Sequence, residues 1–276
     1  MDMFDLKHQT AVISGAARGL GLAFAETLAS AGCNIAVLDI LPQPSSALHE
    51  LGSQHNVKVK YYSIDITVRD HVVSTLSKIV QDFGRVDINI NAAGVVSDES
   101  FLTTSDKNLQ RTFAINVNGF FLVAQACANV MVEQYKSQHG DVPAKDATTG
   151  SIVFIASIAT YIASTAQQIS CYTASKAAIK GLVKPVAMEL SRYGIRVNSL
   201  SPGYTMTDMM RGLQTEQPDL VKQFEKETLF GRIALPQELK GAILWLCSSK
   251  ASGWYTGQDL LLDGGATSWK HPAVLN

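Results

Sequence analysis

The sequence predicts a single-domain α/β protein: a doubly wound Rossmann fold with a seven-stranded parallel sheet and helices on both faces. Two features of the 276-residue chain support this prediction. Short β-branched runs alternate with long amphipathic stretches, as in repeated βαβ units. Several of the short runs are almost continuously apolar, as expected for strands that helices cover on both sides. Length alone would also permit two domains, but no stretch has the composition of a linker or a repeat.

The expected strands are short runs bounded by polar or glycine-containing turns. They cover Thr10–Ser14, Asn34–Leu38, Lys58–Ser63, Ile88–Asn91, Ser151–Ala156, Ile195–Leu200 and Asp259–Leu262. Between them, apolar residues recur at helical spacing, and this pattern predicts helices. The helices cover Leu20–Ala31, His71–Phe83, Lys107–Gln138, Tyr172–Ser191 and Gln237–Ser248, the third being interrupted or frayed near its start.

Two segments do not fit the alternation. Residues 137–150 are polar and contain two glycines and a proline, which indicates a surface loop. Residues 205–232 mix methionine, leucine and phenylalanine with charged residues. A structureless connection of that length is unusual in a compact domain, so we expect a short helical lid over a substrate. A plain surface excursion is the alternative.

Charge and composition argue against several classes of partner. The chain has 23 basic and 24 acidic residues and a pI near 6.6, so it offers no basic surface for nucleic acid or an anionic membrane. Apolar runs are interrupted within about ten residues, short of the roughly 18 that a membrane-spanning helix needs. The start, Met1–Asp5, lacks the basic and apolar parts of a secretory signal, and we expect a cytoplasmic protein.

The four cysteines are expected to be buried free thiols. Cys33, Cys127, Cys171 and Cys247 lie far apart in the sequence and form no CxxC pair. This spacing argues against a disulfide framework and against a zinc site, so no bound metal is expected.

A glycine-rich turn follows the first expected strand, with the sequence Gly15-Ala16-Ala17-Arg18-Gly19-Leu20-Gly21. Glycines let the backbone approach a pyrophosphate, and the free N–H groups at a helix start favour its negative charge. The spacing is GxxxGxG, which differs from the commoner GxGxxG dinucleotide fingerprint. A purely structural turn is the alternative.

Asp39 ends the second expected strand, 18 residues after Gly21. This offset is close to the roughly 20 residues at which a carboxylate meets the adenosine ribose of a dinucleotide. A helix cap or a solvated turn would not explain why the acid stands at a strand end after a glycine turn. We therefore expect Asp39 to bind ribose hydroxyls.

Tyr172 and Lys176 are four residues apart, so on a helix they share one face. A phenol has an ordinary pKa near 10, and a neighbouring ammonium favours its ionised form for acid/base work. Such a pair also arises by chance, and Tyr172 alone would be a packing residue.

Further motifs accompany these at the expected strand ends and in the third helix. They are Asp65-Ile66, Asn91-Ala92-Ala93-Gly94, Asn116, Ser157 and Ser201-Pro202-Gly203. With this set, the sequence resembles the short-chain dehydrogenases/reductases over essentially its whole length. Within that family it looks most similar to the fungal polyol and ketose enzymes, which include arabinitol, mannitol, xylulose and sorbose dehydrogenases or reductases.

The resemblance implies a hydride transfer between a nicotinamide cofactor and a small alcohol or ketone. Tyr172 would donate or remove the proton, and Lys176 would lower the Tyr172 pKa and hold the nicotinamide ribose. Ser157 would position the substrate oxygen, and Asn116 would support a water-linked proton path to Lys176. The implied cofactor-binding residues are Gly15, Arg18, Gly19, Leu20, Gly21, Asp39, Asp65, Ile66, Asn91, Gly94, Tyr172, Lys176, Pro202, Gly203 and Thr205.

One spacing departs from the family pattern. Ser157 precedes Tyr172 by 15 residues, whereas family members usually place this serine two or three residues closer. Ser164 is too near Tyr172 and does not follow the strand directly, so Ser157 keeps the role. The extra residues should reshape the substrate mouth. Expected pocket residues are Val96, Ser97, Ala159, Tyr161, Ile169, Tyr204, Met206 and Met209.

NAD is expected over NADP, because Asp39 should repel a ribose phosphate, although Arg18 could attract one. A homo-oligomer, a tetramer, is expected from the two long helices, with burial inside the monomer as the alternative. The apolar residues considered for this contact are Phe120, Val123, Ala126, Ile179, Val183, Trp254, Tyr255 and Trp269. A polyketide or aromatic-ketone reductase would share every motif, and a non-catalytic dinucleotide-binding regulator is a rival that has no need of Tyr172.

Overall fold

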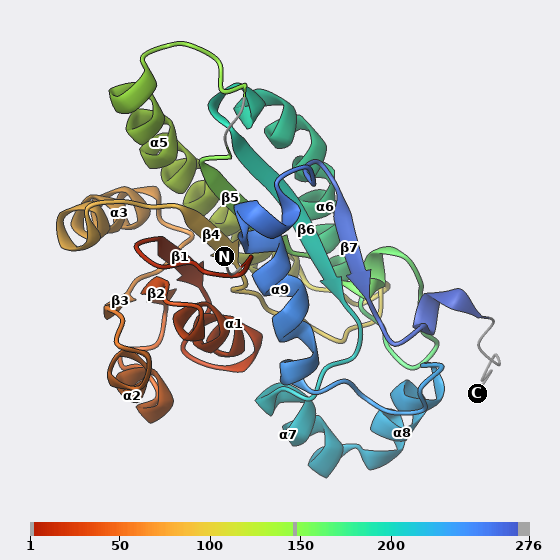
Figure 1. The fold of residues 1–276 in the computed structure, drawn as a ribbon. Coiled ribbons are helices and arrows are strands. Elements are labelled where there is room, and N and C mark those ends of the chain that lie inside the picture. Colours follow the sequence, from red (N-terminus) through yellow and green to blue (C-terminus); the bar gives the residue numbers. More distant parts are fainter. Residues whose placement is uncertain (1–2, 146–147, 270–276) are drawn as a thin grey trace.

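The computed structural model describes residues 3–145 and 148–269 and contains one sheet of seven parallel strands (Figure 1). The strand order is β3-β2-β1-β4-β5-β6-β7. The strands are β1 (Thr10–Ser14), β2 (Asn34–Asp39), β3 (Val59–Ser63), β4 (Ile88–Asn91), β5 (Gly150–Ile155), β6 (Ile195–Pro202) and β7 (Asp259–Leu262). The predicted single-domain α/β fold is confirmed, and every predicted strand is present within two residues of its expected ends.

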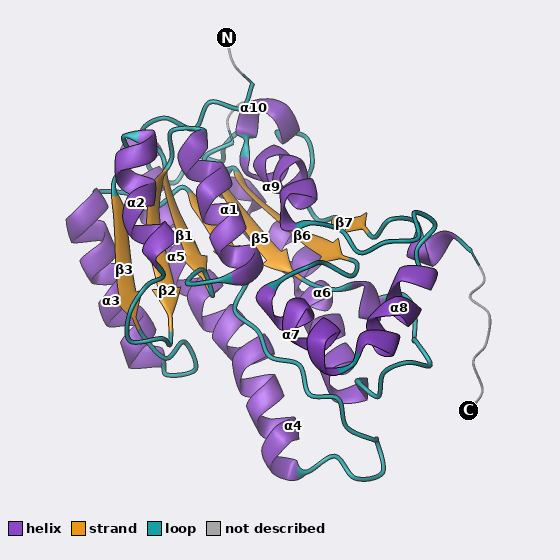
Figure 2. Cartoon of the chain, turned by 90° about the horizontal axis from the view of Figure 1, so that it is seen from below, coloured by secondary structure: helices purple, strands orange, loops and turns teal. Residues whose placement is uncertain are grey.

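Helices cover both faces of this sheet (Figure 2). They are α1 (Gly19–Ser30), α2 (Ser46–His55), α3 (Arg69–Phe83), α4 (Asp106–Phe113), α5 (Phe120–His139), α6 (Ser170–Leu190), α7 (Asp208–Glu216), α8 (Pro218–Lys226), α9 (Lys240–Cys247) and α10 (Ser249–Ser252). Helices α1, α2 and α9 pack on one face, and α3, α5 and α6 pack on the other.

The two cores arise from alternation along the strands. In β1, Ile13 contributes to the core under α1, whereas Val12 contributes to the core under α5 and α6. Val37 and Leu38 of β2 divide between the two cores in the same way. All four side chains are fully buried, which is why the central residues of these strands are apolar in the sequence.

Two helical features differ from the sequence prediction. Helix α2 was not expected, because its only buried residues are Leu48 and Leu51 and the rest of it is polar. The helix expected over 107–138 runs from α4 through a π-helical segment, Ala114–Gly119, into α5. Its expected interruption is therefore a local widening of the helix, and π segments of this kind often occur at functional sites.

The continuous helix Asp106–His139 is long and apolar enough, by length and composition, to cross a membrane. This differs from the expectation that no segment would meet that criterion. Its fully buried residues, among them Phe120, Val123 and Cys127, belong to the core beneath the sheet. The same composition is found in core helices of globular domains, so the feature is weak evidence for a membrane span.

The structure also shows the secondary structure of the two segments that did not fit the alternation, residues 137–150 and 205–232. Helix α5 continues to His139, so the expected loop begins at Gly140, and residues 146–147 of it lie outside the described residues. Residues 205–232 contain α7 and α8, which lie side by side at one end of the molecule (Figure 1). The predicted helical content of this segment is confirmed.

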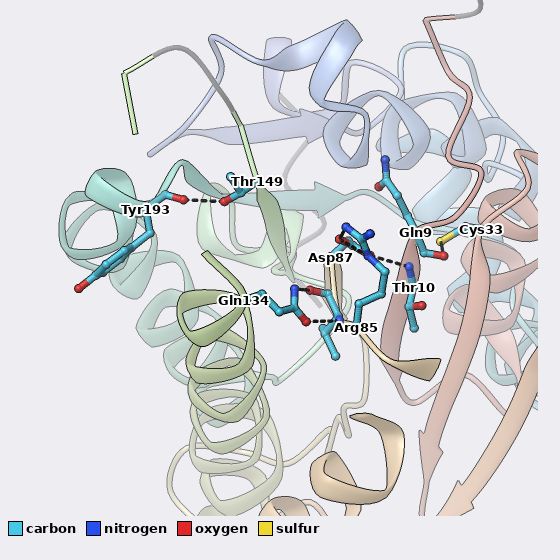
Figure 3. Close-up of polar contacts among 9 residues, drawn as sticks. Gln9, Thr10, Cys33, Arg85, Asp87, Gln134, Thr149 and Tyr193 are labelled. Atoms are coloured by element: carbon cyan, nitrogen blue, oxygen red, sulfur yellow. Dashed lines mark hydrogen bonds and ion pairs between the residues drawn. The ribbon is translucent and has the colours of Figure 1, made fainter. Parts of the chain in front are cut away.

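At the amino ends of the strands, polar contacts tie neighbouring elements together (Figure 3). The Asp87 carboxylate accepts a hydrogen bond from the Thr10 backbone N–H at 2.9 Å and is paired with the Arg85 guanidinium at 2.6 Å. Cys33 donates its thiol to the Gln9 carbonyl at 3.5 Å. All four cysteines are buried and free, as predicted.

Candidate active site

The glycines after β1 form a turn that tolerates no side chain at two positions. A Cβ on Gly15, whose φ is +72°, would lie 2.4 Å from Ala93 Cα, and a Cβ on Gly21 would lie 2.2 Å from the Gly15 carbonyl oxygen. Gly19 has a φ of +61° and no atom within 4 Å of the Cβ position. Gly15 and Gly21 let backbone segments touch, and Gly19 leaves open space at the start of α1.

The start of α1 is suited to bind an anion. The residue before the helix, Arg18, provides no side-chain cap, and the first turn has no acidic residue. Gly19, Leu20 and Gly21 line a cavity of about 1880 Å³ that extends across the carboxyl ends of the strands. Their backbone N–H groups and the helix dipole therefore favour a phosphate group here, which fits the dinucleotide expected from the sequence.

Asp39 lies at the same end of the sheet and lines this cavity. One carboxylate oxygen accepts the Ala17 N–H at 3.0 Å, and the other accepts the Leu41 N–H at 3.2 Å. These bonds fix the carboxylate beside the glycine turn. Arg18 also lines the cavity, and among the described residues no ion pair joins it to Asp39.

Asp65 and Ile66, which follow β3, and Gly94, which follows β4, also line the cavity. Asp65 accepts hydrogen bonds from the backbone and hydroxyl of Thr67 at 2.8 and 2.7 Å. Asn91 is different, because it is fully buried and donates its amide to Asn89 at 2.6 Å. Asn91 is absent from the cavity wall, and its expected place beside the cofactor stays a prediction.

The segment after β6 borders the opposite end of the expected cofactor site. Pro202, Gly203 and Thr205 all line the cavity. A Cβ on Gly203 would lie 2.7 Å from Asp263 Cα, so only glycine lets this turn pass the chain after β7. The Thr205 hydroxyl donates to the Gly203 carbonyl at 3.1 Å and closes the turn.

Helix α6 places Tyr172 and Lys176 one turn apart, and both side chains line the cavity. The Lys176 ammonium nitrogen donates to the Ile155 carbonyl, at the end of β5, at 2.7 Å. It also lies 4.9 Å from the Phe120 ring centroid and 5.8 Å from that of Tyr172. The predicted shared face of Tyr172 and Lys176 is present.

The two groups have shifted acidities. Burial lowers the pKa of Lys176 to about 7. Burial also raises the pKa of Tyr172, and a hydrogen bond with Ser157 opposes that rise. The sequence-based expectation that Lys176 also lowers the Tyr172 pKa stays a prediction. The group that favours the phenolate here is Ser157, whereas burial keeps the phenol protonated.

Ser157 follows β5 after one intervening residue and lines the cavity, 15 residues before Tyr172. Its oxygen accepts the Ala159 N–H at 3.2 Å and starts a short 3₁₀ turn. The residues between Ser157 and the start of α6 at Ser170 form a 3₁₀ turn and a loop, and Ser157 still lies close enough to Tyr172 to lower its pKa. Ser164 lies in that loop and donates to Glu227 instead.

Asn116 is fully buried in the π-helical segment. Its carbonyl oxygen accepts the Val95 N–H at 2.9 Å, and its amide donates to the Val95 carbonyl at 2.9 Å and to Ser175 Oγ at 3.0 Å. A Cβ on Gly94 would lie 3.4 Å from Asn116 Oδ1 and 3.5 Å from the Lys176 nitrogen. Asn116 and Lys176 thus both lie next to Gly94.

The expected substrate pocket is partly correct. Val96, Ala159, Ile169, Tyr204 and Met209 line the cavity. The other three expected residues do not. Tyr161 turns away, because its hydroxyl donates to Asp259 and its ring lies 3.3 Å from the Lys180 nitrogen. Met206 packs in the small apolar cluster around Phe224, and Ser97 is absent from the wall.

Sequence reasoning missed several polar residues of the substrate end of the cavity. They include Asp98, Ser164, Gln167, Gln168, Thr207 and Asp208. They come from three loops that only the fold brings together, and no spacing in the sequence marks them. Chemically, the arrangement joins an anion-binding helix start to a phenol, a hydroxyl and an ammonium at one cavity.

The comparisons with known proteins agree with this geometry. The family model described as enoyl-(acyl carrier protein) reductase matches residues 15–267. A sorbose reductase of Schizosaccharomyces pombe is 37% identical over 273 residues, which cover 96% of this chain and 98% of that protein.

Solved structures also match the whole fold. A short-chain type dehydrogenase/reductase from Mycobacterium marinum is 36% identical with a TM-score of 0.84, covering 96% of this chain and 98% of that one. An NADPH-dependent 3-quinuclidinone reductase from Rhodotorula rubra is 30% identical with a TM-score of 0.83, covering 96% and 93%. The protein is an oxidoreductase that transfers a hydride between a nicotinamide cofactor and an alcohol or ketone. The chain belongs to the short-chain dehydrogenase/reductase family.

Proposed function

We propose that this protein interconverts a ketone and an alcohol of the polyol or ketose class, with Tyr172 as the acid/base and Ser157 as the oxygen-positioning group. The observation that carries this proposal is the meeting of Tyr172, Ser157 and Lys176 at one cavity, beside an uncapped helix start. A protein that only binds a dinucleotide would have no need of a phenol placed beside a serine and an ammonium at this cavity.

The bound nicotinamide supplies the hydride chemistry, and the protein manages the proton. In reduction, Ser157 holds the carbonyl oxygen, and Tyr172 donates its proton to that oxygen as the alcohol forms. Lys176 binds the nicotinamide ribose. Lys176 and Asn116 both lie next to Gly94, and we propose that they support the route by which Tyr172 recovers a proton. In oxidation, each proton transfer runs in reverse.

NAD is proposed as the preferred cofactor. The Asp39 carboxylate is fixed at the end of β2 by two backbone N–H groups, where it favours a free ribose hydroxyl and repels a phosphate. Arg18 is the opposing feature, and the similar reductase from Rhodotorula rubra is NADPH-dependent. Asp39 should dominate because its position is fixed, whereas the Arg18 side chain is exposed and able to turn away.

The polyol or ketose class rests on the substrate end of the cavity. Ser164, Gln167 and Tyr204 there offer hydrogen bonds to several hydroxyl groups. The similar protein of Schizosaccharomyces pombe is a sorbose reductase. The second candidate is an apolar ketone, which Val96 and Met209 on the same walls would favour.

A turnover screen decides between these classes. Ketoses, polyols, steroids and aromatic ketones are each tested with NAD(H) and NADP(H). We expect the highest kcat/KM for a ketose or polyol with NAD(H). Preference for a hydroxyl-free aromatic ketone or a steroid would reject the polyol class, and absence of turnover with every compound would favour the non-catalytic regulator.

Assembly is proposed to be a homotetramer, formed through the outer faces of α5 and α6. The sequence had suggested four residues for this contact that are buried inside the monomer: Phe120, Val123, Ile179 and Val183. The proposed contact therefore uses exposed residues on the outer faces of these helices. On the outer faces, Phe121 and Met188 are exposed apolar side chains.

A further inference from the structure

A buried carboxylate lies behind the wall of the substrate cavity and has no part in the roles proposed above. Glu227 follows α8 and is 2% exposed. One of its oxygens accepts the Tyr204 hydroxyl at 2.6 Å, and the other accepts the Ser164 hydroxyl at 2.7 Å. Gln223, one turn earlier, donates its amide to the second oxygen at 3.4 Å.

These contacts join three segments that are far apart in the sequence. Ser164 belongs to the loop after β5, Tyr204 to the turn after β6, and Glu227 to the end of α8. The Tyr204 ring stacks on Phe224 with 4.4 Å between centroids, and Trp269 donates its indole N–H to the Glu227 carbonyl at 3.2 Å. The carboxylate and both hydroxyls therefore have fixed positions.

Within the described part of the chain, the Glu227 carboxylate accepts hydrogen bonds from neutral side chains, and no Lys, Arg or His forms an ion pair with it. Burying a charge is costly unless hydrogen bonds compensate for the lost water. The protons of Tyr204 and Ser164 are thus directed at Glu227 and away from the cavity.

The consequence concerns what the cavity offers to a substrate. A hydroxyl has one proton and two acceptor lone pairs. Tyr204 and Ser164 both line the cavity, but their protons point at Glu227, so toward the cavity they offer only acceptors. Ser164 already accepts the Ala166 N–H at 3.0 Å, which leaves one acceptor direction free. This wall therefore favours a ligand that donates hydrogen bonds.

We propose that Glu227 is a positioning residue for substrate selection, which fixes Ser164 and Tyr204 as hydrogen-bond acceptors. The cavity then prefers a ketone that carries a hydroxyl group over a hydroxyl-free ketone of the same size. This inference rests on the proposed function and deepens it, because polyols and ketoses are rich in hydroxyl donors. Glu227 itself is absent from the cavity wall and acts through the two hydroxyls.

The test compares 4-hydroxycyclohexanone with cyclohexanone, which differ only in a hydroxyl group remote from the carbonyl. KM and kcat, or inhibition constants where turnover is slow, are measured for wild type, Glu227→Gln and Glu225→Gln. Glutamine has the size of glutamate, but its amide N–H donates, so one hydroxyl must turn its proton into the cavity. Glu225 lies two residues away and is absent from the cavity wall, so it is the matched control for the lost charge.

For Glu227→Gln we expect KM for 4-hydroxycyclohexanone to rise about 3- to 10-fold, the effect of one lost hydrogen bond. The KM of Glu227→Gln for cyclohexanone and its kcat for both ketones should stay within about twofold of the wild-type values. The KM and kcat values of Glu225→Gln should do the same for both ketones. An equal change for both ketones would show a merely structural role and overturn the proposal. So would equal KM values for the two ketones in the wild type.

A second variant keeps the proposal testable if Glu227→Gln does not fold. Tyr204→Phe retains the ring stacked on Phe224 and removes one acceptor, so it should also raise KM only for the hydroxylated ketone. An unchanged KM ratio in Tyr204→Phe would overturn the proposal. Wild-type inactivity on sugars and polyols would instead reject the polyol or ketose class, because the cyclohexanone pair tests the acceptor wall without any sugar.

Discussion

Tyr172 lies in surroundings that keep its hydroxyl protonated until a substrate arrives. Burial disfavours the phenolate, and the nearby Ser157 hydroxyl is the group that stabilises it. A substrate oxygen that accepts the Tyr172 proton would occupy the place where Ser157 also bonds. The same two hydroxyls can therefore bind the ketone and protonate it without another acid.

Tyr172→Phe tests this role directly. We expect kcat to fall by at least about 10²-fold, because a positioned acid/base contributes roughly 10²–10⁴. Cofactor dissociation constants and Tm should change little, since only one hydroxyl is lost. Tyr161→Phe is the matched control, because its hydroxyl bonds Asp259 away from the cavity. A Tyr172→Phe enzyme with wild-type kcat would remove this phenol from the mechanism.

The lowered pKa of Lys176 predicts how the stability of the folded protein depends on pH. Its pKa is about 7 in the folded protein against 10.5 when unperturbed, so between these values the unfolded chain binds more protons. Stability must then rise with pH across this window, by up to about 1.4 kcal/mol per pH unit. Buried Cys and Tyr groups with raised pKa values act oppositely above about pH 9.

The measurement is denaturant unfolding of the cofactor-free enzyme between pH 7 and about 8.5, below those opposing titrations. The free energy of unfolding should rise with pH more steeply for the wild type than for Lys176→Met. Other titrating groups are common to both proteins, so their effects cancel in the difference. Parallel curves for the two proteins would mean that Lys176 remains charged in the folded state.

Asp39 governs the predicted cofactor preference. We expect the wild type to have a kcat/KM about 5- to 150-fold higher for NADH than for NADPH, the size of effect that one unpaired charge produces. Relative to the wild type, Asp39→Ala should raise kcat/KM for NADPH, and Arg18→Ala should lower it. Steady-state kinetics on one ketone gives all six values. Better use of NADPH by the wild type would reject the assignment.

At the scale of elements, the sequence predicted the sheet because its inner strands, β2, β1, β4, β5 and β6, are buried on both faces and so are largely apolar. It could not predict α2, whose only buried residues are Leu48 and Leu51. It also could not place the π-helical segment, because the apolar pattern continues through it and only the backbone widens. Helical content in the lid was predictable because its apolar residues need a surface to cover.

The two helices of the expected lid, α7 and α8, differ in how they are anchored. Helix α8 buries Val221 and Phe224, whereas α7 buries no residue, although Met209, Met210 and Leu213 of α7 face the cavity. We therefore expect α7 to move and α8 to stay. Hydrogen exchange of α7 amides should slow when cofactor and substrate are both bound, with little change in α8. Equal protection of α7 in the free and bound enzyme would reject a lid.

At the scale of the whole molecule, the glycine-turn end of the cavity was predictable and the substrate end was predictable only in part. Glycines, Asp39 and the Tyr172–Lys176 pair have fixed offsets from strands and helices, so their positions follow from the fold. Ser164, Tyr204 and Glu227 meet only because three connections of variable length converge. The same convergence moved Tyr161 from an expected wall residue to a contact with Asp259.

The outer face of α6 gives the sharpest test of assembly. Gly181 lies on this face, and a Cβ there would have no atom within 4 Å, so Gly181→Glu fits the monomer and improves helix propensity. In a tetramer packed through this face, the same carboxylate would be buried against a partner at high cost. Light scattering should therefore give four times the 29.8 kDa chain mass for the wild type and a smaller assembly for Gly181→Glu. Gly241→Glu, equally unhindered on α9, should remain tetrameric, and a monomeric wild type at micromolar concentration would end the proposal.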